Sequence, residues 1–160
     1  MAHGEHKYHV SVEWVGNRGT GTSGYRAYGR DHVIRAGNKP EIPGSSDPAF
    51  LGDARRWNPE DLLVAAASAC HKLWYLHLCS DAGIAVVAYV DEAEGTMRDD
   101  PQGGRFAEIV LRPRVTIRAA GDAAEAVAKA AHLHHAAHAQ CYIANSVNFP
   151  IRCEAVVEVA

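Results

Sequence analysis

One long apolar segment, residues 58–81, constrains the fold more than any other feature of this sequence. Asn58 is a strong helix cap, because its side-chain oxygen can accept an amide hydrogen of the first turn. Pro59 suits the first helical position, and Glu60 places negative charge at the positive end of the helix dipole. The residues that follow are almost wholly apolar, and a helix that is apolar on all sides is a buried one. We therefore expect a buried helix over about residues 59–81, ended by Gly83.

The rest of the chain alternates between strand-like and turn-like segments. Five segments have strand character, the first with the alternation of a half-buried strand: residues 8–15, 25–35, 84–98, 106–118 and 151–159. Residues 99–104 form a turn that makes a hairpin, and residues 36–57 should form a long ordered loop. A second helix should run from its cap at Asp122 to about Asn145. Partly segregated strands and helices favour an α+β fold, and the length favours a single domain over residues 1–160.

Charge and composition narrow the classes of function. The net charge is -3, so nothing electrostatic favours a nucleic-acid partner. We find no apolar run that would cross a bilayer, and residues 1–7 lack the apolar core of a signal peptide. We therefore expect a cytoplasmic protein with no membrane partner. Four cysteines without a CxxC pair form neither a disulfide scaffold nor the usual zinc spacing.

Two cysteines fall in the two expected helices. Cys70 lies in the middle of the first, beside an apolar wall that includes Leu63, Leu73 and Trp74, and Cys141 lies in the second. A buried, unpaired cysteine is more often a small hydrophobic residue than a nucleophile. A reactive Cys70 would need a nearby cation to favour its thiolate, because a mid-helix position is far from the helix terminus. The candidate cations, each of which is otherwise expected to be a solvated surface charge, are Arg30, Arg55 and Arg56.

Glu60 limits how a site around Cys70 can be built. It lies ten residues before Cys70, which along a helix is about 15 Å and about 80° out of phase. In a continuous helix, Glu60 therefore cannot touch Cys70 of the same subunit. Either Glu60 only stabilises the helix start, or the helix start is broken, or two chains of an intertwined dimer share the site. The residues alone favour the first of these.

Four segments resemble the OsmC/Ohr family of peroxide-reducing proteins. Residues 58–71 resemble its central-helix signature, and residues 141–147 resemble its second-cysteine motif. Residues 28–32 resemble its arginine segment, and residues 44–50 with Trp57 resemble a loop of an OsmC-like branch. The match covers essentially the whole chain in the same order.

The resemblance implies an α+β homodimer in which two long central helices are wrapped by antiparallel-rich sheets of both chains. It also implies a thiol peroxidase without cofactor or metal, with Cys70 as the peroxidatic cysteine and Cys141 as the resolving one. Arg30 would activate Cys70, and Glu60 would orient Arg30. The expected partners are a hydroperoxide substrate, a dithiol reductant of lipoyl or small-thiol type, and a second copy of the chain. The apolar wall beside Cys70 suits organic hydroperoxides better than hydrogen peroxide alone.

Two other interpretations stay open. One is a metal-binding protein, because histidine spacings of three and four can place two imidazoles on one helix face. The histidines concerned, with Cys141 three residues after the last, are His132, His134, His135 and His138. The other is an OsmC-fold protein that binds a small molecule without peroxidase activity, since a fold does not fix a function. Cys79 and Cys153 match no motif, and Cys79 should lie in the core.

Overall fold

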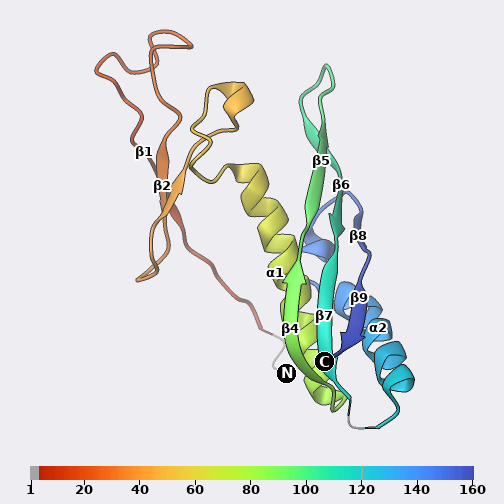
Figure 1. The fold of residues 1–160 in the computed structure, drawn as a ribbon. Helices are drawn as coiled ribbons and strands as arrows, with labels where there is room; N and C mark the ends of the chain where they lie inside the picture. The colour runs from red at the N-terminus through yellow and green to blue at the C-terminus, as the bar shows by residue number, and fades with distance from the viewer. Residues whose placement is uncertain (1–3, 120) are drawn as a thin grey trace. The chain divides into compact units, whose positions relative to one another are not determined.

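The computed structural model describes residues 4–119 and 121–160; Met1, Ala2 and His3, which begin the N-terminal segment, and Ala120 lie outside the described residues. The chain divides into two compact units, Met1–Leu62 and Leu63–Ala160. Each unit has β-structure of its own, as the colours along the chain in Figure 1 show.

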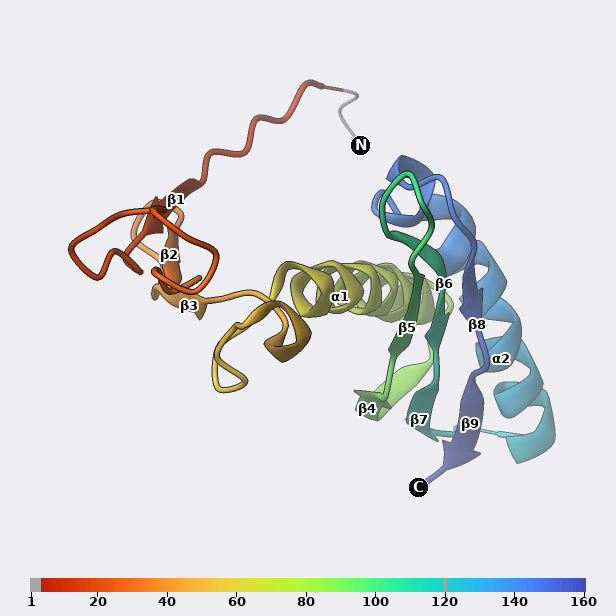
Figure 2. The ribbon, with the colours of Figure 1, turned by 90° about the horizontal axis from the view of Figure 1, so that it is seen from above.

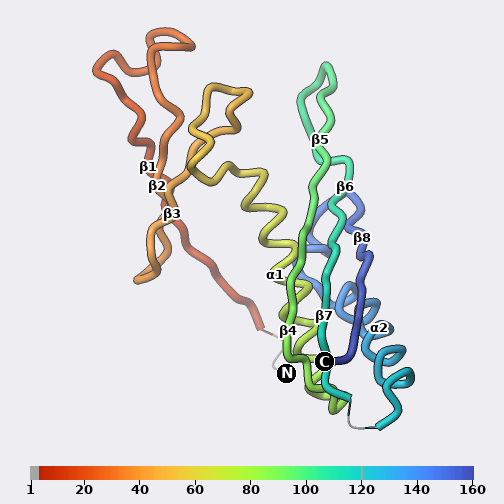
Figure 3. Tube along the Cα trace, in the orientation of Figure 1, coloured from red at the N-terminus to blue at the C-terminus, as the bar shows by residue number. Residues whose placement is uncertain are grey.

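The N-terminal unit contains one small antiparallel sheet. Its strands, in sheet order, are β1 (Ser11–Trp14), β2 (His32–Arg35) and β3 (Ile42–Gly44). Figure 3 traces the long connection between β1 and β2. The predicted loop over residues 36–57 therefore contains a strand, and it also contains the 3-10 helix η1 (Pro48–Phe50).

The first two predicted strands are longer than the observed ones. Strand β1 is confined to four residues, and Val12 within it is 63% exposed, so the expectation of a half-buried strand is wrong for the described chain. Residues 25–31 are not part of β2. The carbonyls of Tyr25 and Tyr28 accept hydrogen bonds from the Arg30 guanidinium, both at 2.7 Å, instead of from a neighbouring strand.

Helix α1 (Pro59–Asp81) has the bounds that the sequence predicts. The side-chain oxygen of Asn58 accepts an amide hydrogen of the first turn at 2.7 Å, which confirms the cap. At the other end, Gly83 has a left-handed φ of 73°, and the amide of Ile84 donates to the Cys79 carbonyl at 2.8 Å. Both predicted ends of the helix are therefore confirmed.

Only one stripe of α1 is buried. Its members recur every four residues: Ala67, His71, Tyr75 and Cys79. Leu73 is 62% exposed, so the expectation of a helix buried on all sides is wrong for the described chain. By length and composition alone, α1 could also cross a membrane, which corrects the expectation that no run is long enough. Core helices of soluble proteins have the same apolar character, so this finding does not decide between them.

The C-terminal unit contains two three-stranded sheets, ordered β4-β7-β9 and β5-β6-β8. Their strands are β4 (Ala85–Asp91), β5 (Glu94–Arg98), β6 (Arg105–Leu111), β7 (Pro113–Arg118), β8 (Ile151–Cys153) and β9 (Val156–Val159). The β5–β6 hairpin is antiparallel, as predicted, and so is the β4–β7 pair. Strands β8 and β9 run parallel to β6 and β7, along the edge visible in Figure 2.

Each of the three long strands predicted for this unit is divided in two. Asp91 ends β4, and its carboxylate accepts the amide hydrogen of Arg112, the residue between β6 and β7, at 2.7 Å. The amide of Glu154, between β8 and β9, donates to the Leu111 carbonyl at 2.8 Å. The breaks in the three strands therefore meet at one level, and these hydrogen bonds replace the regular ladder there.

Helix α2 (Ala123–Gln140) begins at the predicted cap. The Asp122 carboxylate accepts the amide hydrogens of Ala124 and Glu125 at 2.8 and 3.1 Å. The helix ends five residues before the predicted Asn145, because Cys141 has an extended backbone (φ -69°, ψ 110°) and is the C-cap. The 3-10 helix η2 (Ala144–Ser146) follows.

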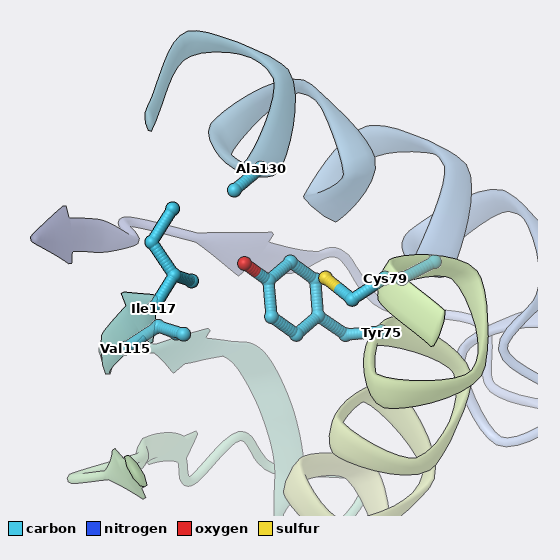
Figure 4. Packing of buried hydrophobic residues seen from close by; sticks show 6 residues of the cluster. Tyr75, Cys79, Val115, Ile117 and Ala130 are labelled. Atoms are coloured by element: carbon cyan, nitrogen blue, oxygen red, sulfur yellow. The ribbon is translucent and has the colours of Figure 1, made fainter. Parts of the chain in front are cut away.

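The two helices and strand β7 form the core of the C-terminal unit. Figure 4 shows Tyr75 and Cys79 of α1 packed with Ala130 of α2 and with Val115 and Ile117 of β7. Cys79 is fully buried, as predicted. Residues 63–81 of α1 are therefore fixed on one side by side chains from both the sheet and the second helix.

Candidate active site

Cys70 and Cys141 are neighbours in the C-terminal unit. Cys70 is half-buried on α1, Cys141 is 2% exposed at the end of α2, and both are free thiols. The Cys70 thiol is close enough to Cys141 to raise the pKa of the Cys141 thiol. Cys141 lies outside α2, so the prediction that it belongs to the second helix is wrong. The sulfur faces Cys70 from the turn that follows the helix.

The turn after α2 surrounds the Cys141 sulfur with backbone amides. The amide of Ala144 donates to Sγ at 3.5 Å, and the Cys141 amide donates to the carbonyl of His138 at 3.2 Å. Burial raises the pKa of the Cys141 thiol to about 11; the amide hydrogens of Ala144 and Ile143 oppose this shift, and the neighbouring Cys70 adds to it. At neutral pH, Cys141 is therefore a protonated thiol that can donate a hydrogen bond to the Cys70 sulfur.

An aromatic pair lies one turn beyond Cys70. Trp74 contacts Tyr142 edge to face, with ring centroids 5.7 Å apart. Tyr142 directly follows Cys141 and is 64% exposed, so the pair joins the two cysteine segments near the surface. Of the predicted apolar wall, Leu63 and Trp74 are half-buried, whereas Leu73 is mostly exposed.

Arg30 is held by aromatic rings and carbonyls of the N-terminal unit. Its guanidinium carbon lies 4.5 Å from the ring centroid of Tyr25 and 4.2 Å from that of Tyr28, which is cation–π geometry. The carbonyls of the same two tyrosines accept its hydrogen bonds. Among the described residues, no carboxylate forms an ion pair with Arg30. Its charge is therefore positioned but not neutralised by an acid within its unit.

The other two candidate arginines are occupied. Arg55 forms an ion pair with Asp53 at 2.8 Å, and Arg56 lies 3.8 Å from Asp31 and 3.9 Å from Asp53. Of the three arginines, Arg30 is therefore the best candidate for the cation that would favour the Cys70 thiolate. Glu60 is half-buried in the first turn of α1 and makes no ion pair with Arg30 within the described parts of the chain.

A second cluster combines two buried histidines, His71 and His134, with the half-buried Cys153. Nε2 of His71 and Nδ1 of His134 are 2.9 Å apart, and the Cys153 sulfur lies 3.6 and 3.8 Å from these atoms. Burial lowers the pKa of His71 to about 4 and that of His134 to about 3, so both rings are neutral at pH 7. Burial raises the pKa of Cys153 to about 11. The His134 ring also stacks on Tyr75, with centroids 3.8 Å apart.

This cluster differs from the histidine group predicted on the second helix. Only His134 belongs to both, because its partners come from α1 and from the last residue of β8. The sequence reasoning missed His71 and Cys153. His71 lies four residues from both Ala67 and Tyr75, and this spacing could have placed it on the buried stripe of α1. No local pattern in the sequence indicates that Cys153 lies beside His71.

The chain is similar to known proteins along most of its length. A family model described as OsmC-like protein matches residues 52–156, and no curated protein matches. An OsmC-like protein of unknown function from Vibrio cholerae is 26% identical, with a TM-score of 0.84 over 95% of this chain and 100% of that one. Two organic hydroperoxide resistance proteins share the fold. The one from Elizabethkingia anophelis is 17% identical, with a TM-score of 0.66 over 99% of this chain and 100% of that one. The one from Legionella pneumophila is 15% identical, with a TM-score of 0.65 over 96% of this chain and 97% of that one.

Proposed function

The chain belongs to the OsmC-like protein family, and from this membership we propose that it is a cysteine-based thiol peroxidase that reduces organic hydroperoxides. The observation that carries the proposal is the proximity of two free thiols, Cys70 on α1 and Cys141 in the turn after α2. Two relatives in fold are named organic hydroperoxide resistance proteins, which supports this class of substrate. The direct test is consumption of cumene hydroperoxide by the protein in the presence of a dithiol such as dihydrolipoamide.

The proposed reaction has three steps that balance in atoms and electrons. The Cys70 thiolate attacks the distal oxygen of ROOH, and the O–O bond breaks. The alkoxide that leaves takes up the proton that the Cys70 thiol released, which gives the alcohol ROH and a sulfenic acid on Cys70. Cys141 attacks that sulfur, a disulfide forms, and water leaves. A dithiol then reduces the disulfide by exchange and is itself oxidised to a cyclic disulfide. The net reaction consumes one hydroperoxide and one dithiol.

The two cysteines suit different roles in this scheme. Half-buried Cys70 can meet a hydroperoxide, whereas Cys141 is almost fully covered. The raised pKa of Cys141 keeps its proton in place at neutral pH. Attack by Cys141 is needed only after Cys70 has been oxidised. Burial therefore supports Cys70 as the peroxidatic residue and Cys141 as the resolving one.

The resolving step should become faster as the pH rises. Because burial raises the pKa of Cys141 to about 11, its thiolate fraction should grow roughly tenfold per pH unit between pH 7 and pH 10. Stopped-flow fluorescence after mixing with one equivalent of cumene hydroperoxide would follow disulfide formation, with Cys141→Ser as the record of oxidation alone. A resolving rate that stays constant or falls over this range would contradict attack by the Cys141 thiolate.

We assign the activating charge to Arg30, because the other two candidate arginines are paired with carboxylates. Arg30→Met should lower kcat/KM for cumene hydroperoxide roughly 10-fold or more, since a nearby cation shifts the balance between thiol and thiolate by about that factor. Arg26→Met removes an exposed arginine from the same turn and serves as the control. Equal losses in both variants would mean that the site senses only the overall charge.

A site shared between two chains explains how Glu60 could act. Helix α1 is continuous from residue 59 to residue 81, and about 15 Å of helical rise separates Glu60 from Cys70. Our proposal is an intertwined homodimer in which Glu60 of one chain orients the arginine that serves Cys70 of the other. The exposed apolar residues Val12 and Leu73 support a partner that covers them.

Mixed dimers test the shared site. Glu60→Gln and Cys70→Ser chains, coexpressed with different tags and purified through both, should recover roughly half the activity of the wild-type dimer, whereas each parent variant stays low. The recovery arises because the mixed dimer has one site with both native groups. No recovery in a verified mixed dimer would mean that each chain builds its own site.

The proposed partners are a hydroperoxide and a dithiol of lipoyl or small-thiol type. A cytoplasmic location, where such thiols are kept reduced, fits this chemistry. No cofactor, nucleic acid or membrane enters the proposed cycle.

A further inference from the structure

The cluster of His71, His134 and Cys153 has no part in the proposed peroxidase cycle. Its two histidines are 1% and 4% exposed, and the Cys153 sulfur is the third potential ligand atom beside their facing nitrogens. Each neutral imidazole has one N–H and one bare nitrogen. A hydrogen bond between the facing nitrogens uses one of each, and Nδ1 of His71 and Nε2 of His134 then have no partner among the described residues.

Such a cluster is costly to bury. A buried polar atom without a hydrogen bond costs on the order of 1–3 kcal/mol, and apolar residues of similar size would fill the same space without that cost. Apolar contacts of Tyr75 and Cys79 also hold α1 against the sheet and the second helix. A metal on the facing atoms would take up their lone pairs, and Nδ1 of His71 and Nε2 of His134 would then both be N–H groups without a partner among the described residues.

The geometry matches the atoms of a metal site. The three facing atoms, Nε2, Nδ1 and Sγ, all lie within 4.8 Å of one another. A metal about 2.0–2.1 Å from nitrogen and about 2.3 Å from sulfur, with three ligands about 120° apart, requires nitrogen–sulfur separations of about 3.7–3.8 Å. The observed separations are 3.6 and 3.8 Å. The two facing nitrogens, which are 2.9 Å apart, would have to move apart by about 0.6 Å.

We propose that His71, His134 and Cys153 form a buried three-coordinate site for Cu(I). The facing imidazole nitrogens donate their lone pairs, and the Cys153 thiol releases its proton to solvent as the copper–sulfur bond forms. Thiolate and imidazole are ligands that Cu(I) accepts, and three of them complete its shell. Tetrahedral Zn(II) would need a fourth ligand such as water, because both oxygens of the neighbouring carboxylate, Asp91, are engaged, by the Arg112 amide at 2.7 Å and the Ser68 hydroxyl at 2.5 Å.

The test must exclude copper bound by the neighbouring thiol pair. The starting protein is therefore the full chain with Cys70→Ser and Cys141→Ser, reduced and titrated anaerobically with Cu(I) in competition with bicinchoninate. It should bind one equivalent, and X-ray absorption should give a shell of one sulfur and two imidazole nitrogens. Because this protein lacks both peroxidase thiols, the result does not depend on the proposed function.

Two further variants of this protein locate the site. Loss of an outer-shell partner weakens metal binding about 10–100-fold. Cys153→Ser removes a direct ligand, so adding it should weaken Cu(I) binding by more than that. Adding Cys79→Ala, at the other buried cysteine, should leave the affinity within about twofold of the starting protein. Circular dichroism checks that each variant is folded. If a variant does not fold, the X-ray absorption spectrum of the starting protein still shows whether the copper ligands are one sulfur and two imidazole nitrogens. An unchanged affinity after Cys153→Ser, a shell without imidazole, or equally tight Zn(II) binding would overturn the proposal.

Discussion

Replacing Cys70 by serine should abolish hydroperoxide turnover. We expect kcat/KM for cumene hydroperoxide to fall by roughly three orders of magnitude or more, to the rate of the buffer with dithiol alone, because a hydroxyl cannot replace the thiolate nucleophile. The measurement is coupled consumption of cumene hydroperoxide with dihydrolipoamide. Sulfur and oxygen differ little in size, so Cys70→Ser should keep the native circular dichroism spectrum.

The matched control for Cys70→Ser is Cys79→Ala. Cys79 lies on the same helix, nine residues further on, and is fully buried beside Tyr75. Its loss can reduce stability but should leave turnover within about twofold of wild type at 25 °C. If turnover persisted in Cys70→Ser and disappeared in Cys79→Ala, the nucleophile would have been assigned to the wrong cysteine.

Replacing Cys141 by serine should divide the cycle at the sulfenic acid. Cys70 should still consume one equivalent of hydroperoxide, but steady-state turnover with a dithiol should fall about 10-fold or more, because the intramolecular attack on sulfur is lost. The sulfenic acid should then accumulate on Cys70, where dimedone traps it. Mass spectrometry of the tryptic peptides identifies the labelled residue.

Cys153→Ser is the control for Cys141→Ser. Burial raises the pKa of both thiols to about 11, but Cys153 faces the histidine pair and Cys141 faces Cys70. Cys153→Ser should therefore leave no sulfenic acid for dimedone to trap after the same treatment. A label on Cys141 in wild-type protein, or unchanged turnover in Cys141→Ser, would reverse or remove the assigned roles.

Local signals in the sequence predicted the central helix well. Asn58 and Gly83 specify its two ends through short-range hydrogen bonds and a left-handed residue, and both features are present. The same reasoning overestimated its burial, because apolar composition does not tell which side of a helix the chain itself covers. Leu73, which is as apolar as the buried residues around it, is mostly exposed in the described chain.

Long-range pairing could not be predicted from single segments. The breaks at Asp91, Arg112 and Glu154 depend on hydrogen bonds between strands that lie far apart in the sequence, so periodicity predicted a single strand for each pair. Pro113 alone indicated a break, bulge or edge position, and β7 begins there. The end of α2 was missed for a similar reason. Cys141 leaves the helix and turns its sulfur towards the amide of Ala144, and no helix-breaking residue marks that point.

The candidate site, like the fold, could be predicted from the sequence only in part. The two cysteine motifs identified the family, which the family model supports over residues 52–156, and the roles of Cys70, Cys141, Arg30 and Glu60 stay predictions. The histidine cluster could not be found from spacing, because its members come from α1, α2 and β8. The histidine spacings indicated a metal site on the second helix, but of the four histidines predicted there only His134 is buried.

The most direct test of the peroxidase is to identify the product of a single oxidation. Fully reduced wild-type protein, mixed with one equivalent of cumene hydroperoxide, is blocked with iodoacetamide, digested without reductant and analysed by mass spectrometry. The proposed mechanism predicts one product, a disulfide that joins the Cys70 peptide to the Cys141 peptide, together with one equivalent of cumyl alcohol. Unconsumed hydroperoxide with both cysteines alkylated, or a disulfide that involves Cys79 or Cys153 instead, would contradict it.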